Sequence, residues 1–247
     1  MKQKTAVVTG ASRGIGAAVA KALFKDGYHV VIDYHHHKEE AERIAVELNR
    51  QDVPQRAIAV QADVSRPEEA EALFRQAKET FGRIDVLVNN AGVAQQKLFT
   101  DITAGDWKTM TGVHLDGTFY CCQLAVREML PRHSGRIINI ASMWGQVGAS
   151  CEVHYSAVKA GVIGLTKALA KEVGPSGITV NCVCPGVIDT DMNSGLSSEI
   201  KEELREETPL CALGTPEDVA AAVAFFAGDG AKFITGQVLG VNGGLVI

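Results

Sequence analysis

The stretch that decides the fold is TGASRGIG, residues 9–16, which follows a short apolar run near the start of the chain. Its glycines Gly10, Gly14 and Gly16 allow a tight turn and a close approach of the backbone to a ligand. If a helix begins after this turn, its free N–H groups and its dipole favour an anionic pyrophosphate. The spacing G-x-x-x-G-x-G differs from the usual dinucleotide fingerprint, G-x-G-x-x-G. The stretch therefore predicts a phosphate-binding turn, with a purely structural tight turn as the alternative.

Outward from this turn, short runs rich in β-branched residues alternate with longer stretches of helical periodicity. The predicted strands are Thr5–Thr9, His29–Asp33, Arg56–Val60, Ile84–Val88, Arg136–Ala141, Ile178–Cys182 and Gln237–Val241. The predicted helices are Gly14–Asp26, Glu39–Gln51, Pro67–Phe81, Asp106–Leu130, Val153–Val173 and Pro216–Ala227. Because strands that are apolar throughout are covered on both faces, the pattern predicts a doubly wound α/β fold with a seven-stranded parallel sheet of the Rossmann type.

No Pro/Gly/Ser-rich linker and no internal repeat interrupts this alternation, so residues 1–247 are expected to form one dinucleotide-binding and catalytic domain. The alternation fails only between Gly186 and Leu213, where a turn leads into the acidic segment Ser197–Glu207. Ligands of parallel sheets bind beyond the carboxyl ends of the strands, and irregular segments there often close over the site. Residues 186–213 are therefore predicted to form a substrate lid.

The composition excludes several classes of protein. With 46% hydrophobic and 21% charged residues, the chain is neither disordered nor fibrous. The formal net charge is −5 and basic residues do not cluster, so neither a nucleic acid nor a membrane surface is an expected partner. No apolar run is long enough for a signal peptide or a membrane span, which predicts a cytoplasmic protein. The six cysteines lack paired spacing and are expected to be reduced and mostly buried.

Tyr155 and Lys159 are four residues apart in a predicted helix and therefore lie on the same face. A phenol has a pKa of about 10, and an ammonium about 5 Å away is expected to lower it by about two units, which suits general acid catalysis. Ser142 follows the fifth predicted strand, where its hydroxyl can donate to a substrate carbonyl oxygen. The Tyr/Lys pair alone is common on surface helices, but with Ser142 it predicts the reduction of a carbonyl group.

The glycine turn, residues 89–92 (NNAG), Ser142, the Tyr/Lys pair and residues 185–186 (PG) occur in the order and at the separations of a known family. The chain resembles the short-chain dehydrogenase/reductase family from Thr5 to its last residue. This resemblance implies one Rossmann-type domain and an oxidoreductase that acts on an alcohol and ketone pair. It also implies a homotetramer, assembled through the helices Asp106–Leu130 and Val153–Val173.

The resemblance implies the site residues position by position. Tyr155 would be the catalytic acid, Ser142 would orient the substrate carbonyl, and Lys159 would also hold the nicotinamide ribose. Asp63 would contact the adenine, and Asn90 would stabilise the sheet beside the cofactor. The residues implied to bind the dinucleotide are Gly10, Ser12, Arg13, Gly14, Ile15, Gly16, Tyr34, His35, Asp63, Val64, Asn90, Ala91, Gly92, Tyr155, Lys159, Pro185, Gly186, Ile188 and Thr190.

His114 lies seven residues after Trp107, where many family members carry a catalytic Asn. In the family, that Asn is thought to hold a water that connects the catalytic lysine to solvent. An imidazole can form the same hydrogen bonds, although it titrates near neutrality. His114 is therefore either a fourth catalytic residue in a proton relay or a histidine that only packs within its helix, and both interpretations stay open.

The end of the second predicted strand bears on the choice of cofactor. Relatives that prefer NAD often carry an acidic residue there, which binds the ribose hydroxyls and repels a 2′-phosphate. That position is Tyr34, although a shift of one residue would make it Asp33. Arg13 and the run His35–His37 offer donors to a phosphate, so NADP(H) is favoured over NAD(H). Contiguous histidines rarely converge on one ion, so no metal site is predicted.

Within the family, the chain is most similar to the 3-oxoacyl-acyl-carrier-protein reductases, which implies a ketone linked to an acyl carrier protein. The segment from Ser142 to Tyr155, which includes Trp144 and Glu152, also resembles a branch that reduces a 5-aminopentanone on elongation factor P. In that case Glu152 would pair with the substrate ammonium; otherwise it is solvated or caps the helix, and Trp144 only packs. An NAD-dependent alcohol dehydrogenase is a further alternative. A non-catalytic dinucleotide sensor is disfavoured because the Ser, Tyr and Lys are all present.

Overall fold

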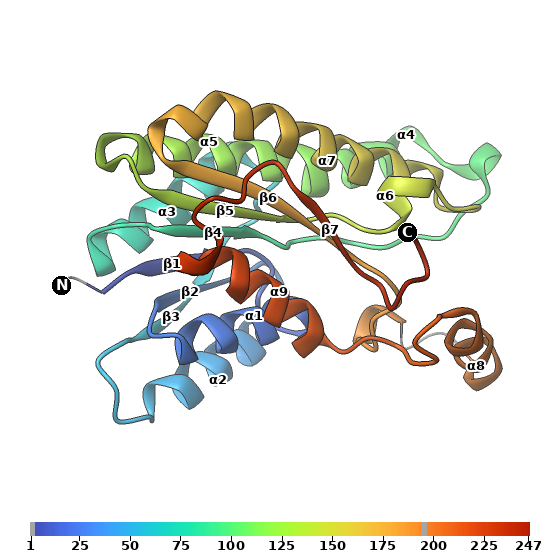
Figure 1. The fold of residues 1–247 in the computed structure, drawn as a ribbon, viewed down its shortest axis with the longest axis horizontal. Coiled ribbons are helices and arrows are strands. Elements are labelled where there is room, and N and C mark those ends of the chain that lie inside the picture. Colours follow the sequence, from blue (N-terminus) through green and yellow to red (C-terminus); the bar gives the residue numbers. More distant parts are fainter. Residues whose placement is uncertain (1–2, 194–196) are drawn as a thin grey trace.

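The computed structural model of the protein describes residues 3–193 and 197–247. Its strands form one sheet in the order β3-β2-β1-β4-β5-β6-β7, and all neighbours are parallel (Figure 1). The strands are β1 (Thr5–Val8), β2 (His29–Tyr34), β3 (Ala57–Gln61), β4 (Val86–Asn89), β5 (Gly135–Ile140), β6 (Ile178–Pro185) and β7 (Val238–Val241). The predicted doubly wound α/β fold is confirmed, whereas the assignment of the whole chain to one domain stays a prediction.

Two layers of helices cover the sheet. In Figure 1, α1, α2 and α9 lie below it, and α3, α5 and α7 lie above it. The helices are α1 (Gly14–Lys25), α2 (Lys38–Asn49), α3 (Pro67–Phe81), α4 (Ala104–Thr111), α5 (Gly117–Met129), α6 (Trp144–Val147), α7 (Val153–Val173), α8 (Ser198–Glu207) and α9 (Pro216–Ala227). Capping boxes at Thr103 and Thr215 fix the starts of α4 and α9, because each threonine accepts the N–H of an aspartate whose carboxylate bonds back to it.

Alternating strand residues build the two cores. Val7 of β1 packs in the cluster of α3 and α5, whereas Ala6 and Val8 pack in the cluster of α1 and α9. Successive side chains of a strand point to opposite faces, so a strand covered on both sides must be apolar throughout. Burial of each large apolar side chain contributes about 1.5–3 kcal/mol to folding. The same rule decides which residues at the strand ends can reach a ligand.

The predicted helix Asp106–Leu130 is wrong as a single α-helix. The chain forms α4, then a π-helical turn (Gly112–Asp116), and then α5. At the junction, Gly117 packs so closely on the loop after β3 that a Cβ would lie 3.0 Å from Val64 Cγ2. A π-helical turn adds one residue to a helix and is frequent at functional sites. Such an insertion leaves the apolar periodicity nearly unchanged, so the sequence pattern did not reveal it.

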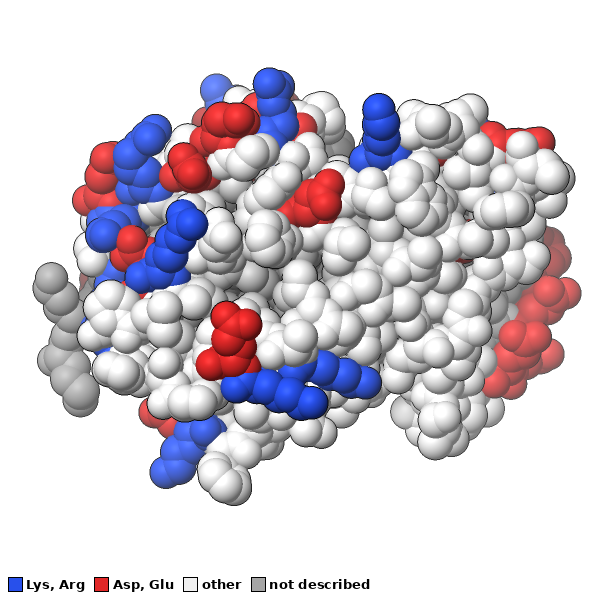
Figure 2. Space-filling model, turned by 90° about the horizontal axis from the view of Figure 1, so that it is seen from above, with Lys and Arg blue, Asp and Glu red and all other residues white. Residues whose placement is uncertain are grey.

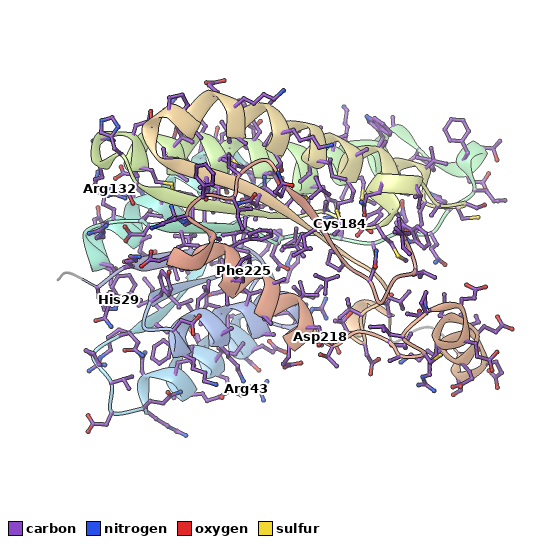
Figure 3. The ribbon with its side chains drawn as sticks, in the orientation of Figure 1. His29, Arg43, Arg132, Cys184, Asp218 and Phe225 are labelled. Carbon is purple, nitrogen blue, oxygen red and sulfur yellow. The ribbon has the colours of Figure 1, made fainter. Side chains whose placement is uncertain are left out.

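The carboxyl ends of the strands lie next to the segments that carry the candidate site. β6 extends to Pro185 rather than to the predicted Cys182, and Figure 3 shows Cys184 near this end. Helix α8 lies beyond the same edge of the sheet (Figure 1). Residues 194–196 of the predicted lid lie outside the described residues, so its closure stays a prediction. Cys121, Cys122, Cys182 and Cys184 are buried free thiols, as expected for most of the cysteines.

None of the described helices combines the length and the apolar character that a membrane span requires. Across residues 3–193 and 197–247, no three His, Cys, Asp or Glu side chains are grouped so that they could hold a metal ion.

Candidate active site

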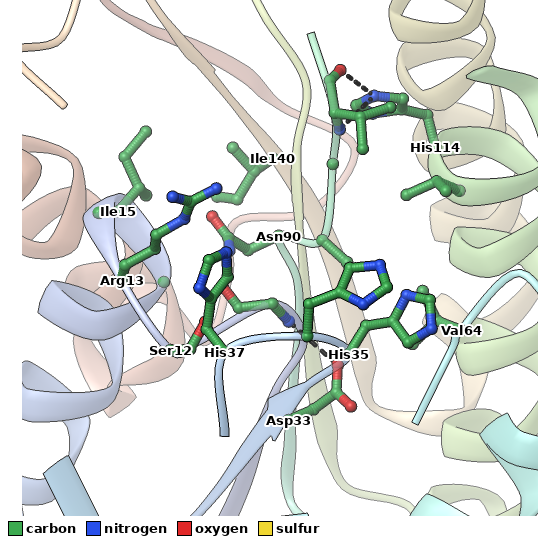
Figure 4. Close-up of a pocket in the computed structure, with 18 of the residues that line it drawn as sticks. Ser12, Arg13, Ile15, Asp33, His35, His37, Val64, Asn90, His114 and Ile140 are labelled. Atoms are coloured by element: carbon green, nitrogen blue, oxygen red, sulfur yellow. Dashed lines mark hydrogen bonds between the residues drawn. The ribbon is translucent and has the colours of Figure 1, made fainter. Parts of the chain in front are cut away.

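A cavity of about 300 Å³ follows the carboxyl edge of the sheet from the glycine turn to α7 (Figure 4). The turn and the segment after β2 line one end, and Tyr155 with Lys159 lines the other. Ligands of doubly wound sheets bind at this edge, where the strand order reverses. In this chain the reversal lies between β1 and β4, beside the glycine turn.

The glycine turn has a geometry that requires glycine. Gly10 and Gly14 have positive φ angles of 60° and 53°. A Cβ on Gly16 would lie 2.4 Å from the Gly10 carbonyl oxygen and 2.5 Å from Asn90 Nδ2. No side chain caps the start of α1, so the N–H groups of its first turn can receive an anion. This cradle fits the pyrophosphate of a dinucleotide.

Asn90 and Thr9 hold the turn against the end of β4. The Asn90 Nδ2 group donates to the carbonyls of Thr9 and Gly10, at 2.9 and 3.0 Å. Thr9 Oγ1 accepts the N–H groups of Asn90 and Ala91, both at 3.0 Å. These bonds support the predicted role of Asn90 in stabilising the sheet beside the cofactor.

Two carboxyl groups whose pKa values are shifted in opposite directions, Asp33 and Asp63, lie at the end of the cavity next to β2 and β3. Asp33 is buried, and the Gly10 N–H donates to its Oδ2 at 3.0 Å. Loss of hydration nevertheless raises the pKa of Asp33 to about 7. Asp63 is only partly buried, and Ser65 donates to it from its N–H at 3.0 Å and its hydroxyl at 2.6 Å. These bonds outweigh the effect of burial and lower the pKa of Asp63.

The structure places Asp33, and not Tyr34, on the cavity wall. Tyr34 is buried in the cluster that packs β2 against α1 and α2. Neighbouring residues of a strand face opposite sides of the sheet, so only one of this pair can face the cavity. The preferred assignment of Tyr34 is therefore corrected to the alternative, Asp33.

The other end of the cavity brings three candidate catalytic side chains together. The Ser142 hydroxyl lies near enough to Tyr155 to lower its pKa by hydrogen bonding. Lys159 Nζ is buried, donates to the Ile140 carbonyl at 2.8 Å and lies 5.6 Å from the centroid of the Tyr155 ring. Ser142 Oγ also accepts the Trp144 N–H at 3.1 Å. This arrangement can place two donors on one substrate oxygen.

The expected lowering of the Tyr155 pKa is wrong for the free protein. Burial raises the pKa of Tyr155 to about 12, and the hydrogen bond from Ser142 offsets this only in part. Burial also lowers the pKa of Lys159 to about 8. The ammonium charge alone would lower the pKa of Tyr155, but loss of hydration dominates for both side chains.

His114 lies in the π-helical turn and contacts both the cofactor cavity and the loop after β4. Its Nε2 lies 3.0 Å from the Val93 N–H and 2.8 Å from the Val93 carbonyl, as the dashed lines in Figure 4 show. A Cβ on Gly92 would lie 2.5 Å from the His114 ring, and the Tyr155 ring meets the imidazole edge-on with centroids 5.4 Å apart. Burial lowers the pKa of His114 well below its usual value, so the ring is neutral.

Glu152 and Trp144 flank the catalytic end without lining the cavity. Gln96 Nε2 donates to Glu152 Oε1 at 3.3 Å. Partial burial raises the pKa of Glu152, and its charge in turn raises the pKa of Tyr155. Trp144 begins α6, which packs tightly on α7, because a Cβ on Gly145 would lie 2.8 Å from the carbonyl carbon of Lys159.

Comparison with known proteins gives matches along nearly the whole chain. The family model described as Enoyl-(Acyl carrier protein) reductase matches residues 10–246. The 3-oxoacyl-[acyl-carrier-protein] reductase FabG of Staphylococcus aureus (strain Mu50 / ATCC 700699) is 44% identical over 242 residues, 98% of each chain. The 3-oxoacyl-[acyl-carrier-protein] reductase of Synechocystis is 43% identical over 245 residues, 99% of this chain and 97% of its own. The FabG of Aquifex aeolicus is 41% identical over 246 residues, 99% of this chain and 98% of its own.

The chain belongs to the short-chain dehydrogenase/reductase family. The family resemblance seen in the sequence is therefore confirmed. In this short-chain dehydrogenase/reductase, the cavity brings together all the predicted dinucleotide-binding residues except four, and it also includes His114. The four that do not line it are Tyr34, Pro185, Gly186 and Ile188. Gly186 instead donates its N–H to Val241 at 2.9 Å, and Ile188 is buried in the core.

Sequence reasoning missed the contacts that hold the loop after β4 over this site. Gln95 and Lys97 both donate to Asp106, at 2.9 and 2.7 Å. The buried His154 lies 2.9 Å from Gln95 Oε1. No local pattern indicates these partners, because they come from three separate segments. Cavity residues such as Ile140 and Asp191 also escaped notice, since neither belongs to a recognisable motif.

Proposed function

We propose that the protein catalyses the NADPH-dependent reduction of a ketone to a secondary alcohol, and that its substrate is a 3-oxoacyl group linked to an acyl carrier protein. The observation that carries this proposal is that Tyr155 and Lys159 line the same cavity as the glycine turn, with Ser142 near enough to Tyr155 to lower its pKa by hydrogen bonding. The names of the relatives support the acyl-carrier substrate.

Tyr155 is the proposed acid. Its hydroxyl gives a proton to the substrate oxygen, while Ser142 donates a second hydrogen bond to the same oxygen. A pKa of about 12 keeps the phenol protonated and ready to donate at neutral pH. The Lys159 ammonium stabilises the phenolate that remains. The bound nicotinamide would supply the hydride that reaches the carbonyl carbon.

His114 is proposed as a positioning residue for the loop after β4. Its contacts with Val93, Gly92 and Tyr155 support this role. The proton-relay role through Lys159 stays a prediction, because the hydrogen bond of Lys159 Nζ goes to Ile140.

NADPH is the proposed cofactor because Arg13 and His35–His37 lie at the end of the cavity that the glycine turn and the segment after β2 line. These side chains form few strong contacts within the part of the protein that the structure describes, so they can bind a phosphate. Arg13 Nη1 lies 3.7 Å from Asp191, and both side chains are more than half exposed. Such an ion pair is weak, so the guanidinium can turn toward a phosphate. The ring centroids of His35 and His36 lie 3.7 Å apart, and both imidazoles can offer further hydrogen-bond donors to a phosphate.

A second candidate is the reduction of a 5-aminopentanone on elongation factor P. The observation that favours it is Glu152, a partly buried carboxylate within electrostatic reach of the Tyr155 hydroxyl. A substrate ammonium would relieve the cost of burying this charge, whereas a fatty acyl chain would not.

The two candidates are separated by NADPH consumption with an acetoacetyl thioester and with aminopentanone-modified elongation factor P. The acyl-carrier proposal predicts a higher kcat/KM for the thioester, unchanged within about threefold by Glu152→Gln. The second candidate predicts a preference for the modified factor and a loss of about tenfold or more in Glu152→Gln. Glu47→Gln, which changes a surface carboxylate paired with Lys21, is the matched control. No NADPH consumption with either ketone would refute both.

The pH dependence of reduction tests the role of Lys159. The pKa of Lys159 is lowered to about 8, so the ammonium is present below this pH and is lost above it. We expect kcat/KM for reduction to be constant near neutrality and to fall about tenfold per pH unit above the pKa, because the phenolate loses its neighbouring charge. A kcat/KM that stays constant to about pH 10 would contradict this role.

We also propose that the protein is a homotetramer that buries the face of α5 and α7. Figure 2 shows this face, where charged side chains gather toward one end, acidic side chains line the opposite edge, and a broad area with few charges lies between them. Trp107 of α4, Phe119 of α5 and Val153 of α7 are 46%, 48% and 41% exposed. Exposed apolar side chains in such an area favour association with another protein surface.

A further inference from the structure

Tyr155 lies in the first turn of α7, and no side chain caps this turn. The helix begins at Val153, and Glu152, the residue before it, makes no side-chain cap hydrogen bond. The N–H groups of a first helical turn have no partner inside the helix, so an uncapped turn opens more easily than the turns that follow. The Ser156 hydroxyl accepts the Ala149 N–H at 3.1 Å, which ties the turn only to the segment directly before it. Contacts with other segments must therefore hold the turn that carries the proposed acid.

The loop after β4 runs antiparallel to the segment that leads into α7. Three consecutive residues of the loop each bond to this segment, and the pairs are Lys97 with Cys151 at 2.8 Å, Gln96 with Glu152 at 3.3 Å, and Gln95 with His154 at 2.9 Å. Figure 1 shows α4, which follows the loop, and α6, which precedes the segment, at the same end of the molecule. Of the residues bonded to the loop in these pairs, only His154 belongs to α7 itself. The loop therefore holds the helix through His154.

The direction of the hydrogen bond between His154 and Gln95 follows from Asp106 of α4. Gln95 Nε2 donates to Asp106 Oδ1 at 2.9 Å. The hydrogen bond from Lys97 lowers the pKa of Asp106, so this group is an ionised carboxylate at neutral pH. A carboxylate only accepts hydrogen bonds, so the amide nitrogen of Gln95 faces Asp106 and the amide oxygen faces His154. His154 Nε2 must then carry the proton that it donates to Gln95 Oε1.

His154 makes this hydrogen bond from a fully buried position. Its side chain is 0% exposed, and its Nδ1 has no hydrogen-bond partner among the described residues. Neighbouring residues of an α-helix point about 100° apart, and Tyr155 lines the cavity whereas His154 faces the loop. The Tyr155 ring also meets His114, which contacts Val93 of the same loop. Tyr155 is thus tied to the loop on two sides of its own helix turn, directly through His114 and along the chain through His154.

We propose that His154 is a positioning residue for the reduction. Through Gln95 and Asp106 it fixes the first turn of α7, so that the Tyr155 hydroxyl stays aligned with the substrate oxygen. Residues 90–93 of the same loop line the cavity, so this chain of hydrogen bonds also fixes Tyr155 relative to a bound dinucleotide. A displacement of about 1 Å in a reacting group can lower kcat about 100-fold. This inference rests on the proposed function, in which Tyr155 is the acid.

Two substitutions of His154 separate its hydrogen bond from its packing. Leucine fills a similar volume without a donor, whereas glutamine places an amide N–H near the position of Nε2. With an acetoacetyl thioester, we expect kcat to fall about 10- to 100-fold in His154→Leu and to stay within about threefold of the wild type in His154→Gln. The KM for the thioester and the Kd for NADPH should change by less than about threefold in both variants, because the displaced acid acts only in the chemical step.

Single-turnover kinetics distinguish this role from a loss of folded protein. Each variant is loaded with NADPH and mixed with a saturating concentration of the thioester, and the oxidation of the bound NADPH is followed. The rate constant describes only the folded molecules, so a smaller folded fraction does not change it. We expect the rate constant itself to fall about 10- to 100-fold in His154→Leu.

Gln95→Leu breaks the same chain of hydrogen bonds at its middle member. Gln95 is only partly buried, so this variant also tests the inference if His154→Leu fails to fold. The two hydrogen bonds act in series, so Gln95→Leu should lose as much as His154→Leu, and the double variant should lose no more than either alone, within about threefold. Thr166→Val is the matched control. It removes a fully buried hydroxyl, which donates to the Val162 carbonyl at 2.8 Å, about three turns further along α7, and should lower the melting temperature without changing the rate constant.

Three results would overturn the inference. They are a wild-type rate constant in both His154→Leu and Gln95→Leu, a loss in His154→Gln as large as that in His154→Leu, and losses that multiply in the double variant. Any of these would leave the proposed reduction intact, because the wild-type protein would still oxidise NADPH with the ketone. If the wild-type protein oxidised NADPH with no ketone, the proposed function would be wrong, and the role of His154 with it.

Discussion

Tyr155→Phe is expected to lower kcat for ketone reduction by about 10³-fold or more while changing the Kd for NADPH by less than about threefold. The substitution removes one hydroxyl, the group that Ser142 contacts and that is proposed to protonate the substrate. The ring stays, so its edge-on contact with His114 and the wall of the cavity are preserved. Steady-state turnover and a fluorescence titration with NADPH measure the two quantities separately.

The matched control is Tyr28→Phe, which removes a buried hydroxyl far from the cavity. The Tyr28 hydroxyl donates to the Ala227 carbonyl at 3.0 Å, and its loss should cost about 1 kcal/mol of stability without changing kcat. If Tyr155→Phe retained more than about a tenth of the wild-type kcat, Tyr155 would not be the acid.

Gly16→Ala is expected to weaken NADPH binding by about 100-fold, which is about 2.7 kcal/mol, and to lower the melting temperature. The added methyl would lie 2.4 Å from the Gly10 carbonyl oxygen and 2.5 Å from Asn90 Nδ2. Neither atom can move easily, because one is backbone and the other is bonded to Thr9 and Gly10. The turn must therefore open, and the N–H groups at the start of α1 lose their alignment.

Gly105→Ala serves as the control for the methyl group itself. Gly105 lies in the first turn of α4, and its added Cβ would meet only Thr103 Oγ1, at an ordinary distance of 3.6 Å. Alanine is the better helix former by about 1 kcal/mol, so this variant should be at least as stable as the wild type. Wild-type NADPH affinity in Gly16→Ala would show that the turn does not hold the cofactor.

The fold and most of the cavity could be predicted because their signals are local. The middle of a strand such as His29–Tyr34 is apolar on both faces, at Val30, Val31 and Ile32, and the glycine turn places Gly10 and Gly14 where positive φ angles favour glycine. Those requirements act within a few residues, so the sequence pattern records them. Tyr155 and Lys159 also follow from local spacing, since one helical turn separates them.

The features that escaped prediction depend on contacts between distant segments. Whether Asp33 or Tyr34 faces the cavity depends on the register of β2 in the sheet. A shift of one residue would exchange the faces of these two side chains. The raised pKa of Tyr155 comes from burial by several elements, which spacing alone does not report. The π-helical turn around His114 ends beside Gly117, which packs closely against Val64 of a distant segment.

The most direct test of the central claim is the fate of a deuterium label. NADPH carrying deuterium at the transferable position of its nicotinamide is incubated with the protein and an acetoacetyl thioester, and the product is analysed by mass spectrometry. We predict one deuterium on the new alcohol carbon, with transfer abolished in Tyr155→Phe. A product without the label, or transfer that persists at the wild-type rate in Tyr155→Phe, would contradict the account.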